Sequence, residues 1–122
     1  FNAPTANESM WSGRVPARTA ALINGTISHA LDFDDTHFGH IGHVSTVVIP
    51  AALAVAETEG ADFDAFLGAA RIGAEVATRV GLWLGRSHYQ AGWHQTATSG
   101  AFGAASAAAI LMDAPPTSTI LN

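Results

Sequence analysis

The fifteen residues from His29 to His43, HALDFDDTHFGHIGH, hold four of the six histidines and three of the ten acidic residues of the chain. Histidine can give or take a proton near neutral pH, and a neighbouring carboxylate orients the imidazole and stabilises its charged form. Imidazoles and carboxylates also bind zinc and iron. A structural interpretation is open as well, in which the aspartates cap helix ends and the histidines lie in a solvated loop.

The spacing of the histidines argues against a metal site. His37, His40 and His43 are three residues apart, which would align them on a helix. Gly39 and Gly42 oppose a continuous helix there, and the spacing matches no compact ligand motif. The chain has no cysteine, so thiolate ligands and disulfides are excluded. We therefore favour acid–base chemistry and expect no metal ligands.

Two other stretches belong to the same hypothesis. The sequence GWHQTATSG places His94 just before a predicted helix, whose first N–H groups would favour a bound carboxylate. Asn24, Ser28 and Asp32 follow each other at intervals of four beside an apolar stripe, so we expect a half-buried polar strip that ends at Asp32. Both stretches favour the acid–base interpretation of the segment from His29 to His43.

The elements that must position these residues are helices. Apolar residues recur with helical spacing in four segments, and glycines or prolines separate them. Asp62 is a plausible N-cap and Gly60 a helix stop. The segment STVVIP is the one candidate strand, and it is short. We predict an all-α chain with helices at about 16–32, 45–56, 63–84 and 96–112, and loops at 1–13, 36–43 and 85–92.

Small residues in the last predicted helix indicate close packing. Gly100, Ala104 and Ala108 form one stripe, and Ser99, Gly103 and Ala107 form another, which predicts a central, buried helix.

Composition limits the partners. Of 122 residues only 12% are charged, and the formal net charge is −5, with five arginines and no lysine. Such a chain has no basic surface for nucleic acid, and its most apolar stretch is too short for a bilayer span. With no signal peptide visible, we expect a cytoplasmic chain and a single domain over residues 1–122 that is a fragment of a larger one.

Three motifs in the right order resemble the MmgE/PrpD family: NGTISHALDFDDTH at 24–37, HVSTVVIPAALAVAE at 43–57 and GWHQTATSGAFGAASAAAIL at 92–111. The family includes 2-methylcitrate dehydratase, cis-aconitate decarboxylase and iminodisuccinate epimerase. The resemblance implies a helical fragment of the large all-helical domain of that fold, without its smaller lid domain. It also implies a homodimer without a metal or organic cofactor.

The resemblance also implies site residues. The family motif places the first Asp of DFDDT on Asp32, its Thr on Thr36, and the two site histidines on His43 and His94. Because the loop after Thr36 is about one residue longer than in the decarboxylase and HVS replaces HPS, His40 competes with His43 for its position. The family site also uses a lysine and a tyrosine from later in the chain. No lysine occurs here, so we expect the fragment alone to be inactive.

The expected function is therefore that of a lyase-type enzyme acting on a small di- or tricarboxylate by proton transfer next to a carboxylate. We expect His43, His94 and Asp32 to be catalytic, and Thr36 and His40 to bind substrate. The function that we expect first is that of a dehydratase acting on 2-methylcitrate, and a decarboxylase or epimerase of the same family is the alternative. A non-catalytic helical module that binds metal or dimerises is the alternative from another class.

Overall fold

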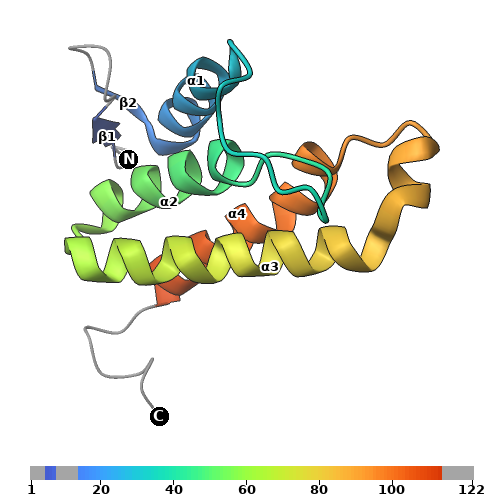
Figure 1. The fold of residues 1–122 in the computed structure, drawn as a ribbon. Helices are drawn as coiled ribbons and strands as arrows, with labels where there is room; N and C mark the ends of the chain where they lie inside the picture. Colours follow the sequence, from blue (N-terminus) through green and yellow to red (C-terminus); the bar gives the residue numbers. More distant parts are fainter. Residues whose placement is uncertain (1–4, 8–13, 114–122) are drawn as a thin grey trace.

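The computed structural model describes residues 5–7 and 14–113 (Figure 1). Two short strands are followed by four helices, which confirms the predicted all-α class. A two-stranded antiparallel ribbon pairs Thr5 with Pro16 and Asn7 with Arg14, where the sequence had predicted only a loop up to residue 13. The elements are β1 (Thr5–Asn7), β2 (Arg14–Pro16), α1 (Ala17–His29), α2 (Ser45–Glu59), α3 (Phe63–Gln90) and α4 (Gln95–Asp113).

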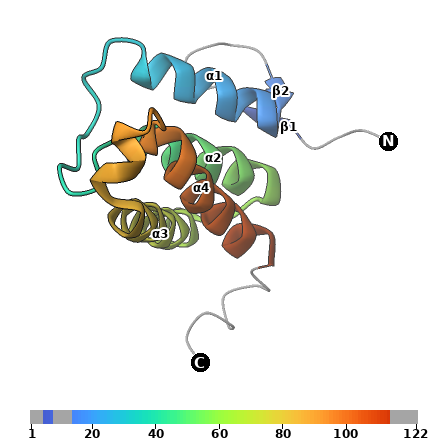
Figure 2. The ribbon, with the colours of Figure 1, turned by 90° about the vertical axis from the view of Figure 1, so that its right-hand side faces the viewer.

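Helix α2, not α4, is the central helix. It lies between α1 on one side and α3 on the other, and it also packs against α4 (Figures 1 and 2). Because both sides of α2 are covered, every second residue of it is buried, from Thr46 to Ala56. STVVIP, the one candidate strand in the sequence, forms the first turns of α2.

Helices α3 and α4 approach each other closely, as the small residues of α4 predict. A Cβ atom added to Gly73 would lie 2.7 Å from the Gly103 carbonyl oxygen, so glycine is required at this crossing. Ser99 and Ala107 are fully buried on the same side of α4. The opposite side, including Phe102, is exposed. The stripe of small residues therefore marks one buried face of α4, and the prediction of a central, buried helix was right for that face only.

The ends of the helices agree with the sequence in two places. The Asp62 side chain accepts a hydrogen bond from the Ala65 N–H (2.8 Å) and caps α3. Gly60 ends α2 in the left-handed conformation, with φ of 66°. The predicted loop over 85–92 was only partly right, because α3 resumes after a break at Gly85 (φ 69°, ψ −176°) and runs to Gln90.

The first helix ends earlier than predicted. α1 stops at His29, so Asp32 lies in the following loop with φ of 58°, and it does not continue the polar strip. Ser28 does belong to a polar contact, since its hydroxyl lies 2.7 Å from that of Thr46 on α2. Within the described ranges, we find no helix that combines the length and the hydropathy needed to cross a membrane.

Candidate functional site

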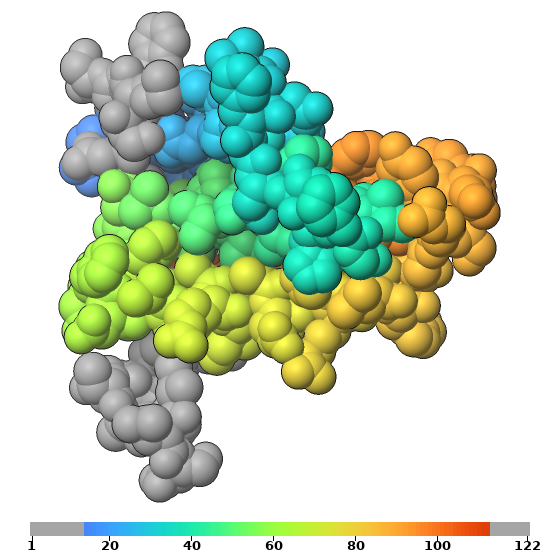
Figure 3. Space-filling view, in the orientation of Figure 1, coloured from blue at the N-terminus to red at the C-terminus, as the bar shows by residue number. Residues whose placement is uncertain are grey.

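The loop that joins α1 to α2, residues 30–44, carries most of the predicted site. It crosses the surface next to the segment that follows the break in α3 (Figure 3). A tight turn closes it: the His37 N–H donates to the Gly42 carbonyl (3.0 Å) and the Ile41 N–H donates to the His37 carbonyl (2.8 Å). The loop therefore has its own internal hydrogen bonds, which hold its side chains in place.

Asp35 attaches this loop to α2. Its carboxylate accepts a hydrogen bond from the Ser45 N–H at 3.0 Å, and the Val44 N–H lies 3.4 Å from its other oxygen. The acceptor at the start of α2 thus comes from ten residues upstream of Ser45, where a carboxylate also interacts favourably with the helix dipole.

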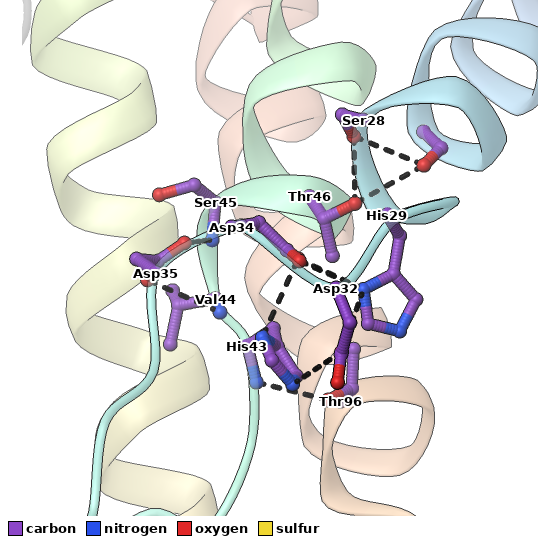
Figure 4. A network of polar contacts seen from close by, with 11 residues as sticks. Ser28, His29, Asp32, Asp34, Asp35, His43, Val44, Ser45, Thr46 and Thr96 are labelled. Carbon is purple, nitrogen blue, oxygen red and sulfur yellow. Dashed lines mark hydrogen bonds and ion pairs between the residues drawn. The ribbon is translucent and has the colours of Figure 1, made fainter.

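Four side chains of the loop and its borders meet in a group that we call the His–Asp cluster: His29, Asp32, Asp34 and His43 (Figure 4). Asp34 is its centre, with one carboxylate oxygen 2.9 Å from His29 Nδ1 and 3.5 Å from His43 Nδ1. Asp32 lies 3.3 Å from His43 Nε2. The two rings stand edge to face with centroids 4.8 Å apart.

The two carboxylates of the cluster differ in environment. The Asp34 side chain is 8% exposed, whereas that of Asp32 is 75% exposed. Burial raises the pKa of Asp34, but its hydrogen bonds with His29 and with its own backbone, and the nearby His29 and His43, lower it more. The pKa of Asp34 therefore lies below its ordinary value, and this carboxyl is ionised at neutral pH.

The sequence predicted Asp32 as the acidic residue of the site and did not predict Asp34 or His29. Asp34 is hydrogen-bonded to His29 and lies 3.5 Å from His43 Nδ1, while the more exposed Asp32 lies at His43 Nε2. The signal for Asp34 was present in the DFDD motif, but the sequence cannot show which of three acids turns inward. His29 is the last residue of α1, and nothing in the sequence indicates that its side chain turns toward the loop.

Thr96 connects the loop to α4. Its hydroxyl accepts a hydrogen bond from the His43 N–H at 2.9 Å. The two predicted motifs, 53 residues apart in sequence, are thus adjacent in the structure.

His94 lies beside the cluster without belonging to it. Its backbone carbonyl accepts hydrogen bonds from the Ala97 and Thr98 N–H groups at the start of α4, and its side chain is exposed. Together with Thr36 and His43, it lines a cavity of about 280 Å³. It also borders a hollow of about 630 Å³ that reaches His29 and the apolar side of α1. The smaller cavity brings three predicted residues together.

His40 is placed elsewhere. It is fully buried against Gly81 of α3, and its Nδ1 lies 3.3 Å from the Ser99 hydroxyl of α4. Burial, together with the neighbouring His37, lowers the pKa of His40. His40 does not line the cavity of Thr36, His43 and His94. Its geometry indicates a packing role and opposes the substrate-binding role that we expected.

The His–Asp cluster also has the donor set of a metal site. One nitrogen or oxygen atom from each of its four residues lies within 4.8 Å of the others. Two imidazoles and two carboxylates suit a divalent cation such as Zn²⁺. His29 Nδ1 is hydrogen-bonded to Asp34, whereas the buried His43 Nδ1 has no hydrogen-bond partner in the described part of the chain. The cluster therefore also suits a histidine placed between carboxylates.

Almost the whole of this chain resembles parts of known proteins. A sequence model of the MmgE/PrpD N-terminal domain matches residues 3–120. The cis-aconitate decarboxylase-like protein oryM of Aspergillus oryzae is 31% identical over 120 residues, which are 89% of this chain. The chain spans 24% of the length of that relative. With its helices and its motifs in place, the chain belongs to the MmgE/PrpD family, a family of lyase type.

Proposed function

We propose that the protein containing this chain is an enzyme that moves a proton next to a carboxylate of a small di- or tricarboxylate. One observation carries the proposal: His43 is held between two carboxylates and faces a cavity that it shares with His94 and Thr36. Removing a proton beside a carboxylate needs a positioned base and support for the enolate-like charge that develops.

The contacts suggest a role for each residue. Asp34 lies 3.5 Å from His43 Nδ1, and this contact favours Nε2 as the atom that exchanges the proton. Asp32 lies at Nε2 and stabilises the imidazolium that forms. His94, across the cavity, is the second proton-transfer group, and the Thr36 hydroxyl donates to a substrate carboxylate. The family resemblance adds a lysine and a tyrosine from another part of the protein.

The reaction type is a finer proposal. Dehydration of 2-methylcitrate, decarboxylation of cis-aconitate and epimerisation of iminodisuccinate all begin or end at a carbon next to a carboxylate. Dehydration remains our leading proposal, and the name of the Aspergillus relative makes cis-aconitate a substrate to test beside it. None of the proposed steps uses a metal or an organic cofactor. We also propose a homodimer and a cytoplasmic location.

The test is an assay of the complete protein that contains this sequence, against these three substrates. We expect turnover of one of them, and a loss of roughly 100-fold or more in kcat for His43→Asn and for His94→Asn. His37→Asn, a change of the exposed histidine in the same loop, is the matched control and should keep its activity. Full activity in both site variants would refute the assignment.

A non-catalytic metal-binding module is the alternative, and the four clustered ligands favour it. Stoichiometric zinc that survives dialysis and is lost in His29→Asn, with no turnover of any carboxylate, would support that alternative. His29→Asn keeps a polar side chain at this position, so a change in zinc content would report the loss of a ligand.

A further inference from the structure

The proposed substrate of the cavity that His43 and His94 line is a polyanion, and no cationic partner for it has yet been named. A substrate with two or three carboxylates needs cationic partners, yet the chain has five arginines, no lysine and a net charge of −5. Arg86 is the one permanently charged side chain among the described residues that line this cavity. Tyr89 lines the cavity beside it. Neither residue has a role in the proton transfer described above.

The backbone under Arg86 is held in a defined position. At Gly85 the backbone adopts φ of 69° and ψ of −176°, a region open essentially to glycine alone, and α3 changes direction there. The fully buried Gln95 donates from Nε2 to the Gly85 carbonyl (2.8 Å). His88 Nε2 lies 3.0 Å from the Thr98 hydroxyl. Two side-chain hydrogen bonds therefore fasten this segment to the start of α4.

Among the described residues, no hydrogen bond or ion pair engages the Arg86 guanidinium or the Tyr89 hydroxyl. Arg86 and Tyr89 are three residues apart on one helical turn, so they project from the same face. No carboxylate among the described residues pairs with Arg86, in contrast to Arg79, which contacts Glu75 at 2.6 Å. The Tyr89 ring lies 6.4 Å from the His94 ring, centroid to centroid. An unpaired guanidinium beside a phenol at the wall of a cavity suits a carboxylate, which it can bind through two parallel hydrogen bonds.

We propose that Arg86 and Tyr89 form a carboxylate-binding subsite, which holds the carboxylate of the substrate that lies away from the reacting carbon. This inference rests on the proposed function, because it assumes that the reacting carbon lies between His43 and His94. The subsite selects substrates with at least two carboxylates, since a monocarboxylate cannot reach the histidines and Arg86 together. Arg86 and Tyr89 are binding residues, and they exchange no proton.

Calorimetry on the complete protein tests the subsite, with citrate as a tricarboxylate probe and propionate as a monocarboxylate. Losing charge-assisted hydrogen bonds should weaken citrate binding roughly 10- to 100-fold in Arg86→Gln. Propionate binding should stay unchanged. Arg86→Lys should recover part of the affinity, and Tyr89→Phe should lose less than Arg86→Gln. Arg79→Gln, which removes an arginine already paired with Glu75, is the matched control and should bind citrate normally.

The outcomes separate the two proposals. Unchanged citrate affinity in both Arg86→Gln and Tyr89→Phe, with activity that depends on His43, overturns the subsite and leaves the proposed function standing. Citrate binding that depends on Arg86 in a protein that turns over none of the three substrates supports the subsite and refutes the proposed reaction. A protein that binds no citrate refutes the subsite.

Discussion

His40 and His43 are three residues apart in one loop, and their surroundings are opposite. His40 is fully buried between α3 and α4, where burial lowers its pKa. The His43 side chain is 14% exposed and lies between two carboxylates at the edge of the cavity. The environment of His40 favours a neutral imidazole. The side of the loop on which a histidine lies thus decides whether its ring is buried between helices or lines the cavity.

The lowered pKa of His40 predicts a pH dependence of stability. As the pH falls below the ordinary value of 6.5, the unfolded chain protonates His40 before the folded chain does, so the free energy of unfolding decreases. Above 6.5 both states hold the neutral ring and the contribution is constant. Urea unfolding at several pH values between 7.5 and 5.5 measures this slope, which should be shallower in His40→Gln.

His88→Gln is the comparison variant for that series. His88 contacts Thr98 near the cavity, and the amide of glutamine can replace its hydrogen bond. The slope should fall more in His40→Gln than in His88→Gln. If His40→Gln kept the full slope of the parent protein, another group would have to cause the pH dependence.

At the scale of the elements, glycines on α3 decide how closely other segments approach. A Cβ atom at Gly81 would overlap the His40 ring, whereas one at Gly68, on the same helix, would meet nothing within 4 Å. Gly81→Ala should therefore cost about 1–3 kcal/mol through overpacking. Gly68→Ala should stabilise the helix by about 0.5–1 kcal/mol.

Urea unfolding of the two alanine variants gives a matched comparison, because the substitution and the helix are the same. The midpoint should fall in Gly81→Ala and rise in Gly68→Ala. Equal midpoints would mean that His40 does not occupy its place against α3.

At the scale of the whole molecule, several large apolar side chains are exposed. Phe33, Phe38 and Trp83 are 91%, 88% and 84% exposed, and none of them packs in the core. Side chains of this size are available for contact with other protein. The chain spans about a quarter of its Aspergillus relative, so both the rest of the protein and a second copy are candidates to cover these side chains.

We expect the complete protein to be a homodimer. Sedimentation equilibrium at micromolar concentration should give twice the mass of one chain, since burying apolar surface drives association. A mass equal to one chain at every concentration would contradict this prediction and would leave the rest of the protein as the covering partner.

The sequence by itself determined the helical class, the four helices and the stretch in which the chemistry is concentrated. Helical periodicity, the Asp62 cap and the Gly60 stop are local signals that act over about four residues, so they can be read without a fold. The family motifs added Asp32, Thr36, His43 and His94 as candidates. Their expected roles in the reaction remain predictions.

Only the tertiary structure decided which of these groups meet. The inward turn of Asp34, the capping of α2 by Asp35, the burial of His40 and the return of Arg86 to the cavity all depend on contacts between segments far apart in the sequence. Such contacts form when a loop without periodicity is fitted between packed helices. The conformation of that loop is set by its partners, and so the chemistry that it carries becomes visible only when the helices are in place.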